Sequence, residues 1–410
     1  MKKRSIKIRK AKIKDDINQG RLITVLKVVS VIFAVLILLF IAADRFGNIT
    51  FSSVGDYFYS MVLGSKRGDG YPYYFESSTP IDVKQIDSDL LVLTSDSTYV
   101  LDSTARKLSG FTHSYSNPLI DSCNGRAILF DVGGFSYRVL SKTKILYEGS
   151  TDQKILTACV GRNGSVAIAT RGENSASQLI VFNSNRKEIF RWDCSKDEII
   201  STDISDKGDR VAVSVIGAEN GELYTRVLIF DFDYQEPVFE YNYGSNTVSK
   251  VEFVKGKMLL ASGPNIMSFI DRKANRVDID LSLNSLARQC TAENNITAAV
   301  FSKYGSSSSK ILTLYNADGK EMFSSEINSA VRSVSCDGRN ISVLTDRQLI
   351  NFNRRGKIIG TADVSSDGIN CYCDADSVYV LTTSTVNSFK TFGNNETKEK
   401  TTTQKNAENA

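Results

Sequence analysis

The residue types that commonly carry catalysis are scarce in this sequence. The chain contains one histidine, His113, within Phe111-Thr112-His113-Ser114-Tyr115. A lone histidine cannot assemble a zinc site, and neither a Gly-x-Ser-x-Gly elbow, a phosphate-binding loop nor a dinucleotide fingerprint occurs. We therefore interpret His113 as a polar residue of a loop or strand end rather than as a general base.

Carboxylates at predicted turns are the next candidates for chemistry. They are Asp206, Asp209, Asp337 and Asp374. Gathered near the centre of a fold, such side chains would bind a cation or a sugar, but an Asp that starts a turn usually accepts a backbone N–H of that turn. No stretch has the spacing of an EF-hand loop. We predict no catalytic residue, no cofactor-binding residue and no metal ligand.

The seven cysteines follow a pattern of their own. Five lie at the predicted end of a strand before a tight turn: Cys123, Cys159, Cys290, Cys336 and Cys373. Ser205 fills that place in another unit. If they share one structural position, face-packed sheets separate them by about 10 Å, whereas a disulfide needs Cα atoms within about 7 Å. We expect small, buried, unbridged residues.

Two cysteines lie outside that pattern. Cys194 and Cys371 are the one pair that this argument leaves open for a disulfide. Cys371-x-Cys373 alternates along a predicted strand and lacks a second pair, so the sequence predicts no metal site there.

The elements that position these residues form a repeat. Apolar strands begin near Leu90, Ala127, Val166, Val211, Met258, Ile296, Ile341 and Val378, at separations of 37, 39, 45, 47, 38, 45 and 37 residues. Each is followed by a further strand, and six of these end in Asn or Asp, as in Leu312-Thr313-Leu314-Tyr315-Asn316. Four-stranded repeats of about 40–45 residues are typical of propeller blades.

The fold class that follows is all-β: a β-propeller of eight blades, or of seven if one unit is an insertion. Its last unit is incomplete, because the sequence becomes polar after Phe389. We expect Tyr73-Tyr74-Phe75-Glu76 to complete that blade as an N-terminal strand, since closure of the ring protects its sheet edges.

The N-terminal region has a different character. Residues 1–27 carry ten Lys and Arg against Asp15 and Asp16, so the chain's net charge of +4 leaves −4 for the remainder. The stretch from Val28 to Ala43 has no charge and one polar residue, Ser30. We predict one N-terminal transmembrane α-helix over residues 22–43, with the N-terminus inside the cell and the C-terminal propeller outside. A cleaved secretory signal is the alternative, and it exports the propeller equally.

The predicted organisation has five parts: a basic cytoplasmic tail at 1–21, the membrane helix at 22–43, a juxtamembrane connector at 44–72, the propeller at 73–390 and a disordered tail at 391–410. The connector contains an apolar stripe at helical spacing, from Val54 to Val62, and ends in the turn Arg67-Gly68-Asp69-Gly70-Tyr71-Pro72.

The repeat, exemplified by Ser333-Val334-Ser335-Cys336-Asp337-Gly338-Arg339, resembles WD40-like and quinoprotein-like β-propellers. Trp192-Asp193 is the sole Trp-Asp dipeptide, and the chain has one tryptophan, so the resemblance covers architecture and brings no active site. The whole layout resembles a family of uncharacterised bacterial single-pass membrane proteins with a propeller ectodomain.

The function that we expect is a non-catalytic binding or scaffolding module at the cell envelope, because propellers present their loops on a rigid face. The expected partners are the membrane and an envelope protein or glycan, with no cofactor and no nucleic acid. An enzyme acting on an envelope glycan or a small extracellular molecule is the alternative, and a component of an envelope assembly or secretion machine is a third. The sequence leaves the oligomeric state open.

Overall fold

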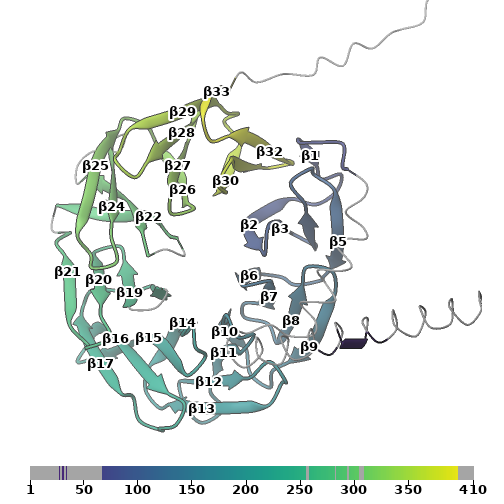
Figure 1. Ribbon diagram of the computed structural model, residues 1–410. Coiled ribbons are helices and arrows are strands. Elements are labelled where there is room, and N and C mark those ends of the chain that lie inside the picture. Colours follow the sequence, from purple (N-terminus) through teal and green to yellow (C-terminus); the bar gives the residue numbers. More distant parts are fainter. Residues whose placement is uncertain are drawn as a thin grey trace, which may run out of the picture. The chain divides into compact units, whose positions relative to one another are not determined.

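Short runs of β-branched and aromatic residues, separated by turn residues, form strands β1 to β33 of the computed structural model. The structure describes residues 67–254, 258–281, 283–292, 295–303 and 309–395, with four isolated positions (27, 30, 31 and 34) before them. These strands build eight antiparallel sheets arranged as a ring (Figure 1). The prediction of an eight-bladed β-propeller is confirmed, and the seven-bladed alternative is wrong.

Blades 1 to 4 each use four consecutive strands. In chain order they are β2 (Pro80–Ile86), β3 (Asp89–Thr94), β4 (Ser97–Leu101) and β5 (Lys107–Thr112); β6 (Pro118–Cys123), β7 (Arg126–Asp131), β8 (Ser136–Ser141) and β9 (Ile145–Ser150); β10 (Ile155–Val160), β11 (Val166–Arg171), β12 (Ser177–Phe182) and β13 (Glu188–Cys194); and β14 (Glu198–Ile204), β15 (Arg210–Glu219), β16 (Glu222–Asp231) and β17 (Phe239–Gly244).

Blades 5 to 8 continue the pattern, with additions in the last two. Their strands are β18 (Lys250–Val254), β19 (Met258–Gly263), β20 (Ile266–Ile270) and β21 (Arg276–Ile279); β22 (Asn284–Thr291), β23 (Thr297–Lys303), β24 (Lys310–Tyr315) and β25 (Glu321–Ile327); β26 (Val331–Cys336), β27 (Asn340–Thr345), β28 (Gln348–Asn353) and β29 (Ile358–Asp363), joined by β33 (Gly393–Asn395); and β30 (Gly368–Cys373), β31 (Ser377–Thr382) and β32 (Thr385–Lys390), joined by β1 (Tyr73–Tyr74).

The eight apolar strands that the sequence repeat predicts are the second strands of their blades. Each starts within one residue of its expected position, from β3 in blade 1 to β31 in blade 8. Second strands are covered on both faces, so all six residues of β3 and of β27 are buried. This double burial explains why their sequences are almost continuously apolar and easy to recognise.

The turns between third and fourth strands follow the expected chemistry. The Asn316 Oδ1 accepts the backbone N–H groups of Asp318 and Lys320, each at 2.9 Å. Asn353 repeats the arrangement with Arg355 at 2.9 Å and Lys357 at 3.1 Å. The Asn or Asp that ends each of these strands therefore starts the hairpin turn, as predicted.

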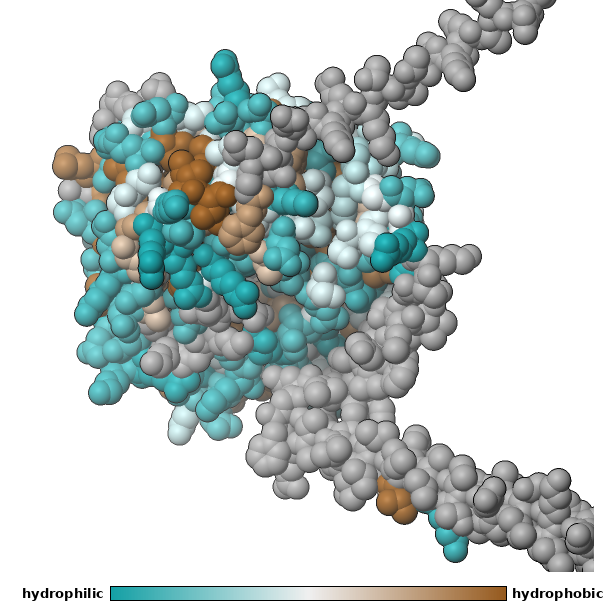
Figure 2. All heavy atoms as spheres, turned by 45° about the horizontal axis from the view of Figure 1, so that its top comes forward, coloured by the Kyte–Doolittle hydropathy of each residue, from teal (hydrophilic) through white to brown (hydrophobic). Residues whose placement is uncertain are grey.

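The hydrophobic core lies between blades. Buried side chains form eight clusters, and each joins two neighbouring blades. One cluster joins blade 8 to blade 1, where Phe75 and Leu381 pack with Val83 and Leu90. The surface seen in Figure 2 is mostly hydrophilic, with hydrophobic side chains gathered in one small area.

The closing strand is the one that the sequence suggested. β1 pairs antiparallel with β32, with Tyr73 opposite Val386 and Tyr74 opposite Thr385, and Phe75 N–H donates to the carbonyl of Ser384 at 2.9 Å. Blade 8 therefore takes its fourth strand from the N-terminal side of the propeller, which protects the edge of β32.

The structure corrects the predicted start of the C-terminal tail. Residues 391–395 belong to the fold, because β33 pairs in parallel with β29, with Gly360 opposite Gly393. Backbone pairing needs no apolar side chain, which is why a polar composition misled the prediction at this point. Residues 396–410 lie outside the described residues.

The N-terminal predictions fall mostly outside the described residues. The predicted span at 22–43 is described only at positions 27, 30, 31 and 34, and the apolar stripe of the connector is not described. Within the part of the chain that the structure describes, no helix is long and apolar enough to cross a membrane. The predicted turn at 67–72 packs on blade 1, where Gly68 N–H donates to Thr104 Oγ1 at 2.8 Å.

The cysteines do not share one position, contrary to the sequence prediction. All five lie near the end of a first strand, but Cys159 and Cys290 pack against the following blade, whereas Cys336 and Cys373 pack against the preceding one. Side chains alternate along a strand, so a shift of one residue moves a thiol to the other blade face.

Cys194 and Cys371 belong to different clusters, between blades 3 and 4 and between blades 7 and 8. All seven cysteines are unbridged in this structure.

Candidate binding site between blades 4 and 5

A pocket of about 350 Å³ opens between blades 4 and 5. It lies on the face of the ring that carries the turns between first and second strands and between third and fourth strands, which we call face 1. Its polar rim and apolar floor come from both blades: Ser205, Asp206, Lys207, Asp209, Arg210, Ile229 and Phe239 from blade 4, and Phe253, Val254, Leu259, Ile270, Asp271 and Arg272 from blade 5.

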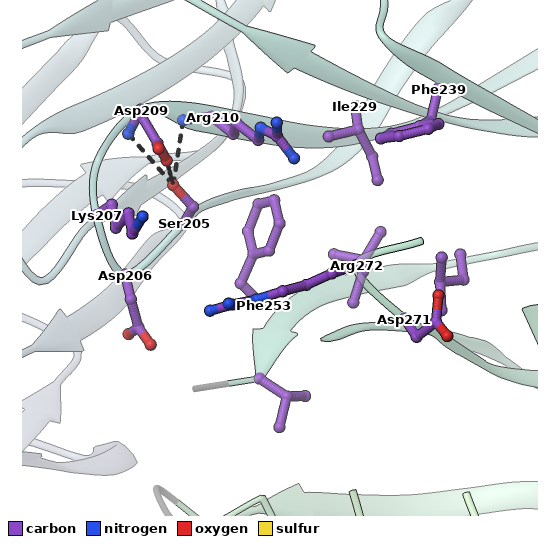
Figure 3. Close-up of a pocket in the computed structure, with 13 residues that line it drawn as sticks. Ser205, Asp206, Lys207, Asp209, Arg210, Ile229, Phe239, Phe253, Asp271 and Arg272 are labelled. Carbon is purple, nitrogen blue, oxygen red and sulfur yellow. Dashed lines mark hydrogen bonds between the residues drawn. The ribbon is translucent and has the colours of Figure 1, made fainter. Parts of the chain in front are cut away.

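The blade 4 side of the rim is a rigid turn after β14. Ser205 Oγ donates to Asp209 Oδ1 at 2.7 Å and accepts the N–H groups of Asp209 and Arg210 at 3.3 and 3.1 Å (Figure 3). Gly208 has a φ of +68°, and a Cβ there would lie 1.8 Å from Asn163 Nδ2. This turn therefore requires a glycine at that position.

Most charges on the rim are already paired. Arg162 of blade 3 reaches Asp206 with its Nε at 3.2 Å from Oδ1, and Arg210 Nε lies 3.2 Å from Asp231 Oδ2. The Asp271 carboxylate accepts the N–H groups of Lys273 and Asn275 at 2.8 and 2.9 Å.

Two cationic side chains on the rim differ from these paired charges. Lys207 and Arg272 are both exposed, and neither forms an ion pair with another described residue. In Figure 3 the Arg272 side chain extends across the pocket below Phe253, toward the turn that holds Asp206. The rim therefore offers positive charge above an apolar floor.

The floor consists of side chains that the interblade core leaves partly uncovered. Phe239 and Phe253 pack against the cluster between blades 4 and 5 without being fully buried. Phe253 is held in place because its backbone N–H donates to Asp203 Oδ2 of blade 4 at 2.5 Å. The arrangement suits an apolar side chain of a ligand, with an acidic group at the rim.

The pKa shifts near the pocket are those of structural groups. Hydrogen bonds from Asn275, from its side chain first and then its backbone, hold the pKa of Asp271 below its usual value. Burial raises the pKa of Asp203, behind the floor, well above its usual value, and the nearby Asp121 and Glu252 carboxylates add to the effect. Asp271 is therefore a charged acceptor that orders its own turn rather than a proton donor.

The structure separates the carboxylates singled out in the sequence. Asp206 and Asp209 line the pocket, while Asp337 and Asp374 follow β26 and β30 in blades 7 and 8. Asp337 Oδ1 accepts the N–H groups of Arg339 and Asn340 at 2.6 and 2.7 Å, and Asp374 accepts the N–H of Ala375 at 2.7 Å. Both cap their own turns, as expected. In the part of the chain that the structure describes, no group of three or more His, Cys, Asp or Glu side chains is arranged to hold a metal ion.

His113 lies in the link after β5, as expected of a loop or strand-end residue. Its N–H donates to the carbonyl of Asp96 at 2.7 Å, and its Nδ1 accepts the N–H of Tyr115 at 3.4 Å. Burial is the main cause that lowers the pKa of His113. It does not line the pocket between blades 4 and 5.

Sequence reasoning found the acidic side of the pocket and missed the rest. Lys207, Phe239, Phe253 and Arg272 come from four separate turns and strands. Their one sequence signal is position within the repeat, because Lys207 follows a first strand and Arg272 follows a third strand. Such turns meet on one face of every propeller, but the sequence does not reveal which pair of blades leaves a gap.

The comparisons agree with the fold. The BamB structure from Moraxella catarrhalis is 12% identical, covers 78% of this chain and 100% of its own, and superposes with a TM-score of 0.51. The C-terminal WD40 domain of Sif2 is 11% identical, covers 78% of this chain and 98% of its own, with a TM-score of 0.57. At such identities the likeness concerns the fold alone.

The sequence comparisons point to one family. No curated protein matches the sequence. A family model described as a family of unknown function, DUF5711, matches residues 73–391, which span the ring from the closing strand β1 to the end of blade 8. The chain therefore belongs to the DUF5711 family.

Proposed function

We propose that the chain is a non-catalytic binding module that holds a partner protein at the cell envelope through the pocket between blades 4 and 5. The observation that carries the proposal is this pocket, with Phe239 and Phe253 in its floor and the cations of Lys207 and Arg272 on its rim. Charge complementarity favours a partner segment that inserts an apolar side chain and places a carboxylate beside it.

The location is part of the same proposal. The basic residues before Val28 and the uncharged stretch to Ala43 support a single membrane anchor with the propeller outside the cytoplasmic membrane. In this proposal the propeller works by binding, and its partner supplies any further activity.

The enzyme alternative has less support from the geometry. It requires His113 or several carboxylates to converge on one cavity with pKa values suited to proton transfer. His113 lies apart from the pocket, and the described carboxylates of the rim are engaged in turns and ion pairs.

The experiment is site-specific photocrosslinking in native membranes. A photoreactive amino acid replaces Lys273, which is exposed beside Arg272, and cross-linked peptides are identified by mass spectrometry. We expect one recurrent partner peptide that contains Asp or Glu beside an apolar residue. The double variant Lys207→Glu/Arg272→Glu should reduce its yield at least tenfold, since two attractive contacts become repulsive.

A matched control separates this site from general electrostatics. Arg339→Glu/Arg355→Glu makes the same change in net charge at the corresponding turns of blade 7, where both residues are exposed. The control should retain the cross-link. Equal loss in both double variants, or no cross-linked partner from position 273, would refute the proposal.

A further inference from the structure

Cys290 and Cys336 face each other across one blade interface. Cys290 lies in β22 of blade 6 and Cys336 ends β26 of blade 7. Cys336 belongs to the hydrophobic cluster between these blades, and Cys290 packs against the same cluster. The Cys336 thiol donates to the carbonyl oxygen of Cys290, with Sγ 3.4 Å from that oxygen, and the two thiols also interact with each other.

The inner strands of blades 6 and 7 approach each other more closely than face-packed sheets do. Blades converge toward the centre of the ring, where β22 and β26 are neighbouring strands (Figure 1) with Cα atoms within 8 Å of each other. A spacing of about 10 Å between packed sheets applies to the middle of a blade. The distance argument against disulfides therefore fails for first strands whose cysteines point at one another.

We propose that Cys290 and Cys336 are a redox-active thiol pair that forms a reversible disulfide between blades 6 and 7. The oxidant is a disulfide, either a small molecule or a protein. Cys290 thiolate attacks one sulfur of the oxidant, forms a mixed disulfide and releases the first thiol. Cys336 then gives up its proton and attacks Cys290 Sγ, which forms the interblade bond and releases the second thiol.

The surroundings assign the two roles. Cys290 is partly exposed, whereas Cys336 is buried at 7% exposure. The interaction with the Cys336 thiol is the largest cause that lowers the pKa of Cys290, and Lys250 contributes to the same effect. The pKa of Cys336 is raised, because a thiol that donates to its neighbour retains its proton. Cys290 is thus the attacking residue and Cys336 the resolving one.

Other cysteines of the chain are poor substitutes in this pair. Cys373 belongs to blade 8 and packs against blade 7. Its side chain therefore lies at the interface between blades 7 and 8, not at the interface between blades 6 and 7. Burial raises the pKa of Cys371 to about 12, and burial likewise raises the pKa of Cys123 to about 12. Neither forms a thiolate readily near neutral pH.

The test uses the full-length chain, reduced and then exposed to oxidised glutathione near pH 7.5. Free thiols are alkylated in denaturant, and the protein is digested without reduction for mass spectrometry. We expect a 290–336 cross-linked peptide, a loss of two of the seven free thiols, and a rise in Tm of several degrees because the bond closes a long loop. Dithiothreitol should reverse all three.

Single variants supply the controls. Cys290→Ser and Cys336→Ser should each abolish the cross-link and the rise in Tm, while Cys194→Ser, in another cluster, should leave both unchanged. The proposal fails if Cys290 and Cys336 are recovered as alkylated thiols. It also fails if glutathione remains attached to Cys290 and is not displaced by Cys336. A third contrary result would be the same 290–336 cross-link, in equal yield, from the urea-unfolded chain.

Discussion

At the scale of single residues, burial decides what the ionisable groups can do. His113 is 8% exposed, and its Nε2 has no hydrogen-bond partner. The charged groups near it are Asp96 and Arg138, with opposite effects on its pKa, while Tyr115 lies against the ring at 5.2 Å between centroids. Burial therefore disfavours the charged imidazolium in the folded protein, which suits a structural residue.

The lowered pKa of His113 predicts a pH dependence of stability. Its pKa is lowered on folding, so below an unfolded value of about 6.5 the unfolded chain takes up a proton that the folded chain does not. The free energy of unfolding should therefore fall as the pH drops from 7.5 toward 5. In His113→Asn, where Oδ1 can still accept the Tyr115 N–H, this part of the decline should be absent.

Urea titrations of both proteins between pH 5 and 7.5 measure the effect. The raised pKa of Asp203 gives an opposite trend, since a carboxyl protonated more readily in the folded state gains stability as the pH falls. That trend is common to both proteins and cancels in their difference. Parallel pH profiles for the wild type and the variant would contradict the assignment.

At the scale of elements, the two-residue strand β1 has an effect larger than its length suggests. It supplies the fourth strand of blade 8, and the next residue, Phe75, is 8% exposed. The Phe75 ring packs 5.1 Å from Tyr73 and 5.3 Å from Tyr99 of blade 1, measured between ring centroids. One short segment therefore completes a sheet and joins the last blade to the first.

Two neighbouring substitutions separate these contributions. Phe75→Ala should lower the free energy of unfolding by about 3 kcal/mol, because it removes a buried aromatic side chain and leaves a cavity. Tyr74→Ala, at a side chain 67% exposed, should change it by less than about 0.5 kcal/mol. Denaturant unfolding of both variants provides the comparison. If both variants lose similarly small amounts of free energy of unfolding, Phe75 does not stabilise the interface between blades 8 and 1.

At the scale of the whole molecule, the ring has no free beginning or end. Each of the eight blades shares a hydrophobic cluster with both of its neighbours. A closed ring of this kind holds its face-1 turns in fixed positions, which makes the pocket between blades 4 and 5 a preformed site.

The proposed topology is testable on intact cells. One epitope tag is placed before Lys2 and another after Ala410. Antibodies added to intact wall-free cells should bind the C-terminal tag, and they should bind the N-terminal tag only after the cells are permeabilised. The expectation follows from the excess of Lys and Arg before residue 28. Labelling of the N-terminal tag on intact cells, or protection of the C-terminal tag, would overturn it.

The sequence by itself determined the blades, because strands buried on both faces must be apolar and the turns between them need Asn, Asp or Gly. It also identified the closing strand, since an incomplete last unit requires a partner. The tertiary structure decided what depends on the approach of different blades. It showed which thiols meet, because a shift of one residue turns Cys336 toward Cys290. It also showed where two blades leave a pocket, because Lys207 and Arg272 are far apart in sequence and are brought together by the packing of blade 4 against blade 5.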